Sequence, residues 1–459
     1  MSISLSIIYL IATITFVIGL KKLGHPATAK NGNLIAAIGM GLAIAGTIFI
    51  HDLQVPTIIY VLIGLAIAIG SAIGAWMAIK VKMTKMPELV SLFNGFGGAS
   101  AALIGLVEFS KNVGDKMQAT TIVSGIIIGA ITFSGSLIAW GKLNGSLKSV
   151  VKIPFHKIVN NLFLIGIIAF AVFMVTTGVN DQVFVGVLLA TGLIYGILFV
   201  LPIGGADMPV VISLLNSLTG IAAAITGILY SNMVMLVGGI LVGSAGIILT
   251  IAMCKGMNRT LGAVIFGSFG ATDAVADTDK KFGSIKKTNP SDAAIMMNYA
   301  TNVIIVPGYG LAVAQAQHVI HELEELLTKK GVNVKYAIHP VAGRMPGHMN
   351  VLLAESNVDY SLLLEMDDIN PQFKNTDVVL VVGANDVVNP AAHNDPSSPI
   401  YGMPILDVEN AKHIIVNKRT MNAGYAGIEN ELFYNSKTVM LFGDAKDALT
   451  SLVSELKNM

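Results

Sequence analysis

The sequence is poor in charge: Asp, Glu, Lys and Arg make up only 12% of its 459 residues, whereas hydrophobic residues make up 54%. This composition excludes a disordered chain and fits a protein with several membrane-spanning helices. The formal net charge of +1 gives no reason to expect nucleic acid as a partner. A single cysteine, Cys254, excludes an internal disulfide and a cysteine-ligated metal cluster, and we expect no metal site. The N-terminus also lacks the basic segment and cleavage site of a signal peptide, so the first apolar run is expected to remain as a membrane helix.

Nine apolar runs are long enough to cross the roughly 30 Å hydrocarbon layer of a bilayer, which takes about 20 residues. They lie at about 3–20, 33–50, 55–79, 86–107, 119–140, 158–177, 182–202, 208–228 and 233–253. Within the first 260 residues, the loops after the first, third, fifth and ninth runs carry 12 basic residues, whereas the opposite loops hold only Lys111 and Lys116. Because basic loops stay in the cytoplasm, we predict an outside N-terminus and a cytoplasmic C-terminal half.

Ionisable groups inside these runs are scarce. Only Glu88 falls within one, and none of the nine histidines does. Amides remain, and two of them each head a stripe of small residues: Asn94, Gly98 and Ala102 in the fourth run, and Asn216, Gly220 and Ala224 in the eighth. Such stripes allow close helix packing, and the amides could also line a narrow path that contains water. Between the seventh and eighth runs, Asp207 is either a simple turn acid or a contact with the C-terminal half.

The C-terminal half has the charge density of a soluble domain. We expect a membrane domain over 1–255, a flexible linker over 256–289, and a nucleotide-binding domain over 290–459, with Ser291 and Asp292 capping its first helix. Strands are expected near 302–306, 333–338, 377–382, 412–417 and 437–442, and helices near 311–329, 348–356 and 444–457. This alternation predicts a Rossmann-like α/β domain whose parallel sheet binds ligands beyond the carboxyl ends of its strands.

The first two strands are followed by loops that suit a dinucleotide. Gly308, Tyr309 and Gly310 come between the first strand and its helix, where N–H groups and the helix dipole favour a pyrophosphate. The second strand ends at His339 without the acid that usually binds the ribose of NAD, which disfavours that cofactor. Arg344, in the next loop, suits a phosphate or a nicotinamide amide, or is a plain surface residue.

The later strands add charged groups at the same edge. Asp386 follows the strand at 377–382 and is either a turn residue or an acid that couples the cofactor to another site. Lys418 and Arg419 follow the strand at 412–417, where the pair fits a 2′-phosphate. The glycine-containing loop 420–427 after them is predicted to be a mobile flap. Asp444 is either the cap of the last helix or a further ligand contact.

Several long motifs identify a family resemblance over essentially the whole length. They are Val306–Gln317, Pro340–Glu355, Gly383–Asp386, Lys418–Arg419 and Phe442–Lys446. With the nine apolar runs, they resemble the beta subunit of proton-translocating NAD(P) transhydrogenase. The resemblance implies that hydride passes directly from NADH on a separate alpha subunit to NADP⁺ on this chain, driven by protons moving inward across a bacterial inner membrane. It also implies a dimer of alpha–beta units, in which this chain alone is catalytically incomplete.

The resemblance carries over to particular residues. It implies that Arg344 and Asp386 are catalytic, and that NADP(H) contacts Gly308, Tyr309, Gly310, Val341, Ala342, Gly343, Arg344, Met345, Pro346, Gly383, Ala384, Asn385, Asp386, Val387, Gly402, Met403, Lys418, Arg419, Thr420, Met421, Asn422, Ala423, Gly424, Tyr425, Asp444 and Ala445. Some family members carry a histidine where this chain has Asn94. We therefore expect the partner to supply the titratable group, while Asn94, Asn216 and Asp207 contribute to the proton path. The alternative is a transporter or channel whose C-terminal domain senses nucleotides.

Overall fold

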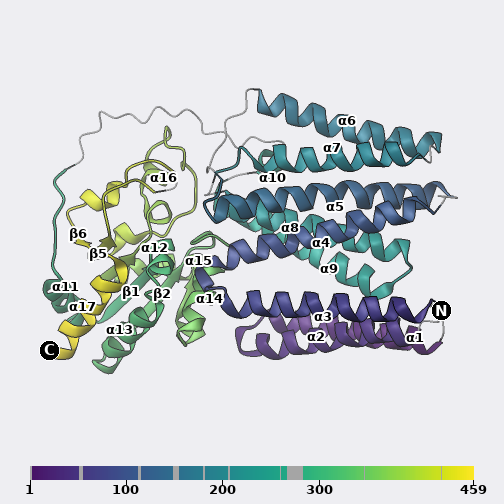
Figure 1. Cartoon of the computed structure of the whole chain (residues 1–459). Coiled ribbons are helices and arrows are strands. Elements are labelled where there is room, and N and C mark those ends of the chain that lie inside the picture. The colour runs from purple at the N-terminus through teal and green to yellow at the C-terminus, as the bar shows by residue number, and fades with distance from the viewer. Residues whose placement is uncertain are drawn as a thin grey trace. The chain divides into compact units, whose positions relative to one another are not determined.

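The protein divides into a helical unit and a unit built on a parallel sheet (Figure 1). The computed structural model describes residues 3–50, 55–111, 115–147, 155–178, 181–204, 207–258, 260–265, 283–345, 347–424 and 426–459. The first compact unit contains Met1–Ile203 and Val211–Leu249, and the second contains Gly204–Val210 and Thr250–Met459. The expected membrane-plus-α/β architecture is confirmed, and each unit is described by itself below.

Nine helices in the described part of the chain are long and apolar enough to cross a membrane, as predicted. They are α1 (Ile3–Leu23), α2 (Pro26–Phe49), α3 (Thr57–Lys80), α4 (Met86–Phe109), α5 (Lys116–Leu143), α6 (His156–Thr177), α7 (Gln182–Val200), α8 (Met208–Leu229) and α9 (Met233–Gly256). Several run further than the apolar runs alone indicate. As a result Glu108 lies in the last turn of α4 and His156 is the first residue of α6, so the expectation that no histidine and only one acid lie within the spans is wrong at the helix ends.

Both small-residue stripes lie at close helix contacts. On α4, a Cβ added at Gly98 would meet the backbone oxygen of Gly129 on α5 at 2.8 Å. On α8, a Cβ added at Gly220 would meet the backbone nitrogen of Gly243 on α9 at 2.4 Å. Asn94, one turn before Gly98, donates from Nδ2 to the Ser136 hydroxyl of α5 over 3.0 Å. The small residues therefore serve packing, because any side chain at these points would push the helices apart.

The sheet of the second unit has six strands in the order β3-β2-β1-β4-β5-β6, and every neighbouring pair is parallel. The strands are β1 (Asn302–Pro307), β2 (Asn333–Ile338), β3 (Leu363–Glu365), β4 (Val378–Val382), β5 (His413–Lys418) and β6 (Thr438–Phe442). All five residues of β4 are buried, as expected of a parallel strand covered on both faces. This strand order is that of a doubly wound dinucleotide-binding fold, in which ligands bind where the order reverses, between β1 and β4.

The helices of this unit are α10 (Leu261–Ile265), α11 (Pro290–Asn298), α12 (Tyr309–Val313), α13 (Gln317–Lys329), α14 (His348–Glu355), α15 (Met366–Ile369), α16 (Ala391–Asn394) and α17 (Ala445–Asn458). Three short ones, α10, α15 and α16, were not predicted, and α10 lies within the segment expected as a linker. The single helix expected at 311–329 is two, because Gln315 adopts a positive φ of 51° between them. The side chain of Asn289, rather than Ser291 or Asp292, caps α11. The three-residue strand β3 was not predicted.

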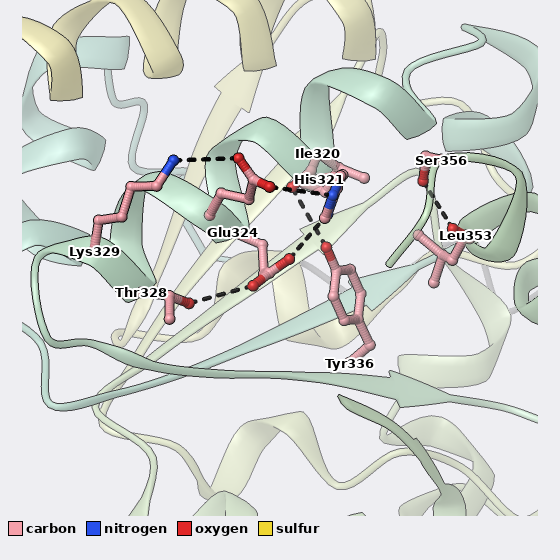
Figure 2. A network of polar contacts seen from close by, with 9 residues as sticks. Ile320, His321, Glu324, Thr328, Lys329, Tyr336, Leu353 and Ser356 are labelled. Atoms are coloured by element: carbon pink, nitrogen blue, oxygen red, sulfur yellow. Dashed lines mark hydrogen bonds and ion pairs between the residues drawn. The ribbon is translucent and has the colours of Figure 1, made fainter. Parts of the chain in front are cut away.

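A polar network anchors α13 on the sheet (Figure 2). The buried carboxylate of Glu324 lies 3.0 Å from Nδ1 of His321 and accepts a hydrogen bond from Thr328 over 3.3 Å. Beside it, the hydroxyl of Tyr336 on β2 donates to the backbone oxygen of Ile320 over 3.4 Å. A buried carboxylate requires such partners, since an unpaired charge away from water is costly. The network therefore holds α13, the second helix after β1, in one position.

A short extended segment continues the sheet beyond β6. The amide of Met440 donates to the oxygen of Lys286 over 2.8 Å, and the amide of Thr288 donates to the oxygen of Met440 over 3.0 Å. Lys287 thereby pairs with Met440 in the parallel sense. The last residues of the segment expected as a linker thus run along the edge of the sheet, whereas residues 266–282 lie outside the described residues.

Candidate functional site

The loops after β1 and β4 touch through their backbones at the point where the strand order reverses. The amide of Gly308 donates to the oxygen of Val382 over 2.9 Å, and that of Gly310 donates to the oxygen of Gly383 over 3.0 Å. A Cβ added at Gly310 would lie 2.6 Å from the Cα of Gly383, which itself has a φ of 67°. Glycine is thus required here for contact between the two loops.

This contact changes the expected role of the glycine turn. Two N–H groups assigned to a pyrophosphate are already bonded to the β4 side, and α12 has only five residues. A helix dipole sums over aligned peptide units, so α12 offers less positive potential than the 19-residue helix expected at 311–329. Charged side chains must therefore supply more of any attraction for phosphate at this edge.

The loops after β1 and β2 meet through three side chains. The guanidinium carbon of Arg344 lies 4.4 Å from the centre of the Tyr309 ring, and the rings of Tyr309 and His348 are 6.4 Å apart. Nδ1 of His348 accepts the backbone N–H of Arg344 over 3.0 Å. A cation over an aromatic face is held electrostatically, so Arg344 is fixed beside Tyr309 rather than loose on the surface. The structure thus places Tyr309 and Arg344 in contact, although they are 35 residues apart in the sequence.

Two buried histidines bracket the Arg344 loop. His339, 2% exposed, donates from Nε2 to the oxygen of Pro404 over 2.8 Å and accepts the amide of Val341 at Nδ1 over 3.2 Å. Burial lowers the pKa of His339 to about 4. Burial and the nearby charge of Arg344 likewise lower the pKa of His348 to about 4. Both rings are neutral at pH 7, with Nδ1 as the acceptor. In the sequence, His339 was noted only because it stands where NAD-binding domains have an acid. The signal that was missed is the pair of histidines, one at each end of the 339–348 loop.

The loop after β4 supports the segment predicted as a flap. One carboxylate oxygen of Asp386 accepts the backbone N–H of Ala426 over 2.9 Å. The amide of Asn430 donates to the backbone oxygen of Asn385 over 2.9 Å. A Cβ added at Gly424 would lie 2.5 Å from Asp386, so the backbone there rests directly on the carboxylate. Asp386 therefore binds the loop at 420–427 to the loop after β4. Asn430 adds a second hydrogen bond to that loop, which the sequence did not indicate.

The two cations after β5 have different surroundings. The half-buried Lys418 donates to the backbone oxygen of Asn422, and its ammonium lies 4.8 Å from the centre of the Phe433 ring. Burial lowers the pKa of Lys418, while the charges of Asp386 and Glu429 oppose that shift. Arg419 is exposed and forms no ion pair with any residue that the structure describes. Lys418 therefore closes the base of the loop, whereas Arg419 is the more available cation.

The remaining predicted residues fall into two groups. Asp444 is the cap of α17, since its carboxylate accepts the amide of Lys446 over 3.0 Å. Met403 is buried in a small apolar cluster against which Val341 and Val387 pack, so residues 402 and 403 lie beside both loops. Pro346 and Tyr425 lie outside the described residues. Asp207 directly precedes α8, and Asn94 and Asn216 lie on α4 and α8.

The donors at this edge fit an acceptor-rich ligand. Nε2 of His348 and Nδ2 of Asn385 are buried and have no hydrogen-bond partner among the described residues. His348 is the first residue of α14, after β2, and Asn385 lies in the loop after β4; these two strands flank β1. Buried donors are rarely left without an acceptor in a folded protein. Together with Arg344, Lys418 and Arg419, they suit a ligand that carries phosphate and carbonyl oxygens.

Comparison with known proteins agrees with this geometry. The sequence model of the family described as NAD(P) transhydrogenase beta subunit matches residues 5–455. Two relatives from Rhodospirillum rubrum, one of them from a named strain, are each called NAD(P) transhydrogenase subunit beta. Each is 47% identical over 460 residues that cover 98% of this chain and 98% of the relative. The chain therefore belongs to the NAD(P) transhydrogenase beta-subunit family.

Proposed function

We propose that residues 290–459 form the NADP(H)-binding domain of a proton-translocating transhydrogenase whose alpha subunit holds NAD(H). Family membership makes the chain one subunit of an oxidoreductase that works with nicotinamide dinucleotides, and it implies an alpha subunit as partner. The observation that carries the choice of NADP(H) is the pair of cations at the end of β5, combined with a neutral histidine, instead of an acid, directly after β2. A transporter that merely senses nucleotides has no observation in its favour.

In this proposal each loop has a separate task. Arg419, with Lys418 behind it, binds the 2′-phosphate, since a guanidinium can hold a phosphate through two parallel hydrogen bonds. Arg344, steadied by Tyr309, would bind the nicotinamide amide and so orient the ring. When bound, the nicotinamide ring supplies the site that accepts or gives up hydride. The side chains of this domain contribute binding, orientation and exclusion of water.

Asp386 has the position to link the cofactor to the rest of the molecule. Its carboxylate binds the backbone of the 420–427 loop and acts electrostatically on Lys418. Protonation of Asp386 would weaken its attraction for Lys418 and loosen its bond to Ala426, because a neutral acid is the poorer acceptor. We therefore assign to Asp386 the coupling of the loop to proton uptake, with the loop as a lid over the cofactor.

The membrane domain, proposed as residues 1–255, would carry protons toward a cytoplasmic nucleotide domain. The basic loops on one side support an outside N-terminus in a bacterial inner membrane. Oδ1 of Asn94 is buried without a partner among the described residues, so it is available to a water molecule. Amides cannot change charge, so the titratable group is assigned to the alpha subunit. Asn216 lines the same path, Asp207 lies at its cytoplasmic end, and the active assembly is a dimer of alpha–beta units.

The test is a comparison of NADPH and NADH binding to the purified full chain. An Arg419→Ala variant should bind NADPH roughly 10- to 100-fold more weakly and NADH unchanged, since a hydrogen bond to a charged group is worth about 1.5–3 kcal/mol. The matched control is Lys412→Ala, which removes one positive charge near the amino end of β5, where Lys412 pairs with Asp377 over 2.8 Å. Equal affinity of the unmodified chain for the two nucleotides would refute the proposal.

A further inference from the structure

The edge segment before α11 brings one lysine to the same corner of the sheet as Lys418. Lys287 pairs with Met440 beside β6, and its ammonium lies 5.8 Å from the centre of the Phe442 ring. Phe442 is the last residue of β6 and lies in register with Lys418, the last residue of β5. The side chain of Lys287 therefore runs toward the carboxyl ends of the strands, where the proposed ligand binds.

The neighbouring lysine runs the other way. The ammonium of Lys286 donates to the backbone oxygen of Ser436 over 2.7 Å, and Ser436 precedes the first residue of β6. The chain thus contains two adjacent lysines of equal charge, of which only Lys287 lies at the ligand-binding edge.

Both cations and acids lie at this corner of the sheet. Phe433 and Phe442 belong to one apolar cluster, and the ammonium groups of Lys418 and Lys287 lie over these two rings. Asp386 and Glu429 act on Lys418, whereas Lys287 forms no ion pair in the part of the chain that the structure describes. Asp444, which follows β6, accepts the amide of Lys446. Lys287 and the exposed Arg419 are therefore the two cations of this corner that form no ion pair with a described residue, and they suit a doubly charged anion.

We propose that Lys287 is a third cation of the 2′-phosphate site, contributed by the edge segment that follows the linker. This inference rests on the proposed NADP(H) function, and its ligand is the phosphate monoester of a 2′-phosphorylated adenosine nucleotide. The sheet edge then has a second role. Because residues 286–288 are hydrogen-bonded to β6, binding of the 2′-phosphate also steadies the segment through which the domain joins the rest of the chain.

The test measures binding of 2′,5′-ADP and of 5′-AMP to the purified full chain by calorimetry. Lys287→Met keeps an unbranched apolar stem beside Phe442 and removes the charge, and it should weaken 2′,5′-ADP binding roughly three- to tenfold. Binding of 5′-AMP should be unchanged. Lys287→Arg, which keeps the charge, should retain the 2′,5′-ADP affinity of the unmodified chain. The matched control Lys286→Met should bind 2′,5′-ADP within about twofold of the unmodified chain. Unchanged 2′,5′-ADP binding in Lys287→Met, or equal weakening of both ligands, would overturn the inference.

An Arg419→Ala variant separates this inference from the function on which it rests. One outcome is that Arg419→Ala loses the preference for 2′,5′-ADP over 5′-AMP, whereas Lys287→Met shows this preference undiminished. Lys287 is then not part of the site, and the proposed function stands. If the unmodified chain shows no preference for 2′,5′-ADP, both proposals fail together.

Discussion

Acidification should open the Arg344 loop through its two histidines. His339 and His348 have pKa values of about 4 in the folded chain, against 6.5 for a free side chain. Each accepts a loop amide at Nδ1, and protonation would replace that acceptor with a donor. The opened loop therefore binds protons more tightly than the closed loop. The closed state is favoured in full above about pH 6.5 and loses stability as the pH falls toward 4.

The size of the effect follows from these pKa values. At about pH 5, each histidine that becomes exposed on opening shifts the equilibrium by roughly 2 kcal/mol relative to pH 7, or about 20-fold. The two together would reach several hundredfold if one opening event exposes both. Strands such as β4, which contain no histidine and are fully buried, should not respond in the same way.

Hydrogen–deuterium exchange of the full chain checks this prediction. Peptides covering 338–349 should lose protection between pH 7 and 5 after correction for the intrinsic exchange rate, while peptides covering 378–382 should not. A double variant, His339→Gln with His348→Gln, should lose the pH dependence. His413→Gln, at an exposed histidine of β5, should retain it. A loop whose protection is the same at both pH values, or a double variant that still responds, would refute the reasoning.

Two further predictions concern the loops at the sheet edge. Gly310→Ala should destabilise the nucleotide domain by roughly 2 kcal/mol or more, because the new Cβ would lie 2.6 Å from the backbone of Gly383. Thermal unfolding measures this loss. The control is Gly283→Ala, whose Cβ would have its nearest neighbouring atom at 4.0 Å. A melting temperature for Gly310→Ala equal to that of the control would show that the loops after β1 and β4 can move apart with little loss of stability. Asp386→Ala should speed tryptic cleavage after Arg419, since the N–H of Ala426 loses its acceptor, whereas Asp386→Asn keeps an oxygen for that bond and should be cleaved at nearly the native rate. Identical cleavage of Asp386→Ala and the native chain would mean that this bond does not hold the loop.

The membrane helices and the main strands could be predicted because their signals are local. An apolar run of about 20 residues must be helical inside a bilayer, and no distant residue is needed to decide it. The same holds for the β-branched runs of β1 and β4, which read as buried strands. Strand β3 was missed because its three residues are too few to carry a periodic signal, and it forms by pairing with β2.

Local reasoning was less reliable where two patterns compete. The stretch from 311 to 329 reads as one helix, yet the structure breaks it at Gln315 between α12 and α13. Three residues near the start of α11 could each cap it, and only the backbone geometry selects Asn289. Such choices differ by about 1 kcal/mol in local preference, which packing against the rest of the domain readily overrides.

The chemistry of the site depends on contacts between loops that are distant in the sequence. The sequence indicated that the loops after successive parallel strands share one edge, and so it grouped Tyr309, Arg344, Asp386 and Arg419. The tertiary structure decided that Arg344 rests on Tyr309, that Asp386 binds the 420–427 loop, and that Lys287 reaches the corner beside Lys418. It also decided the neutral state of His339 and His348, because burial and not residue type sets their pKa values. The hydrophobic pattern along the chain predicts which segments form the strands and helices. The direction and burial of each side chain are set only when these elements pack against one another.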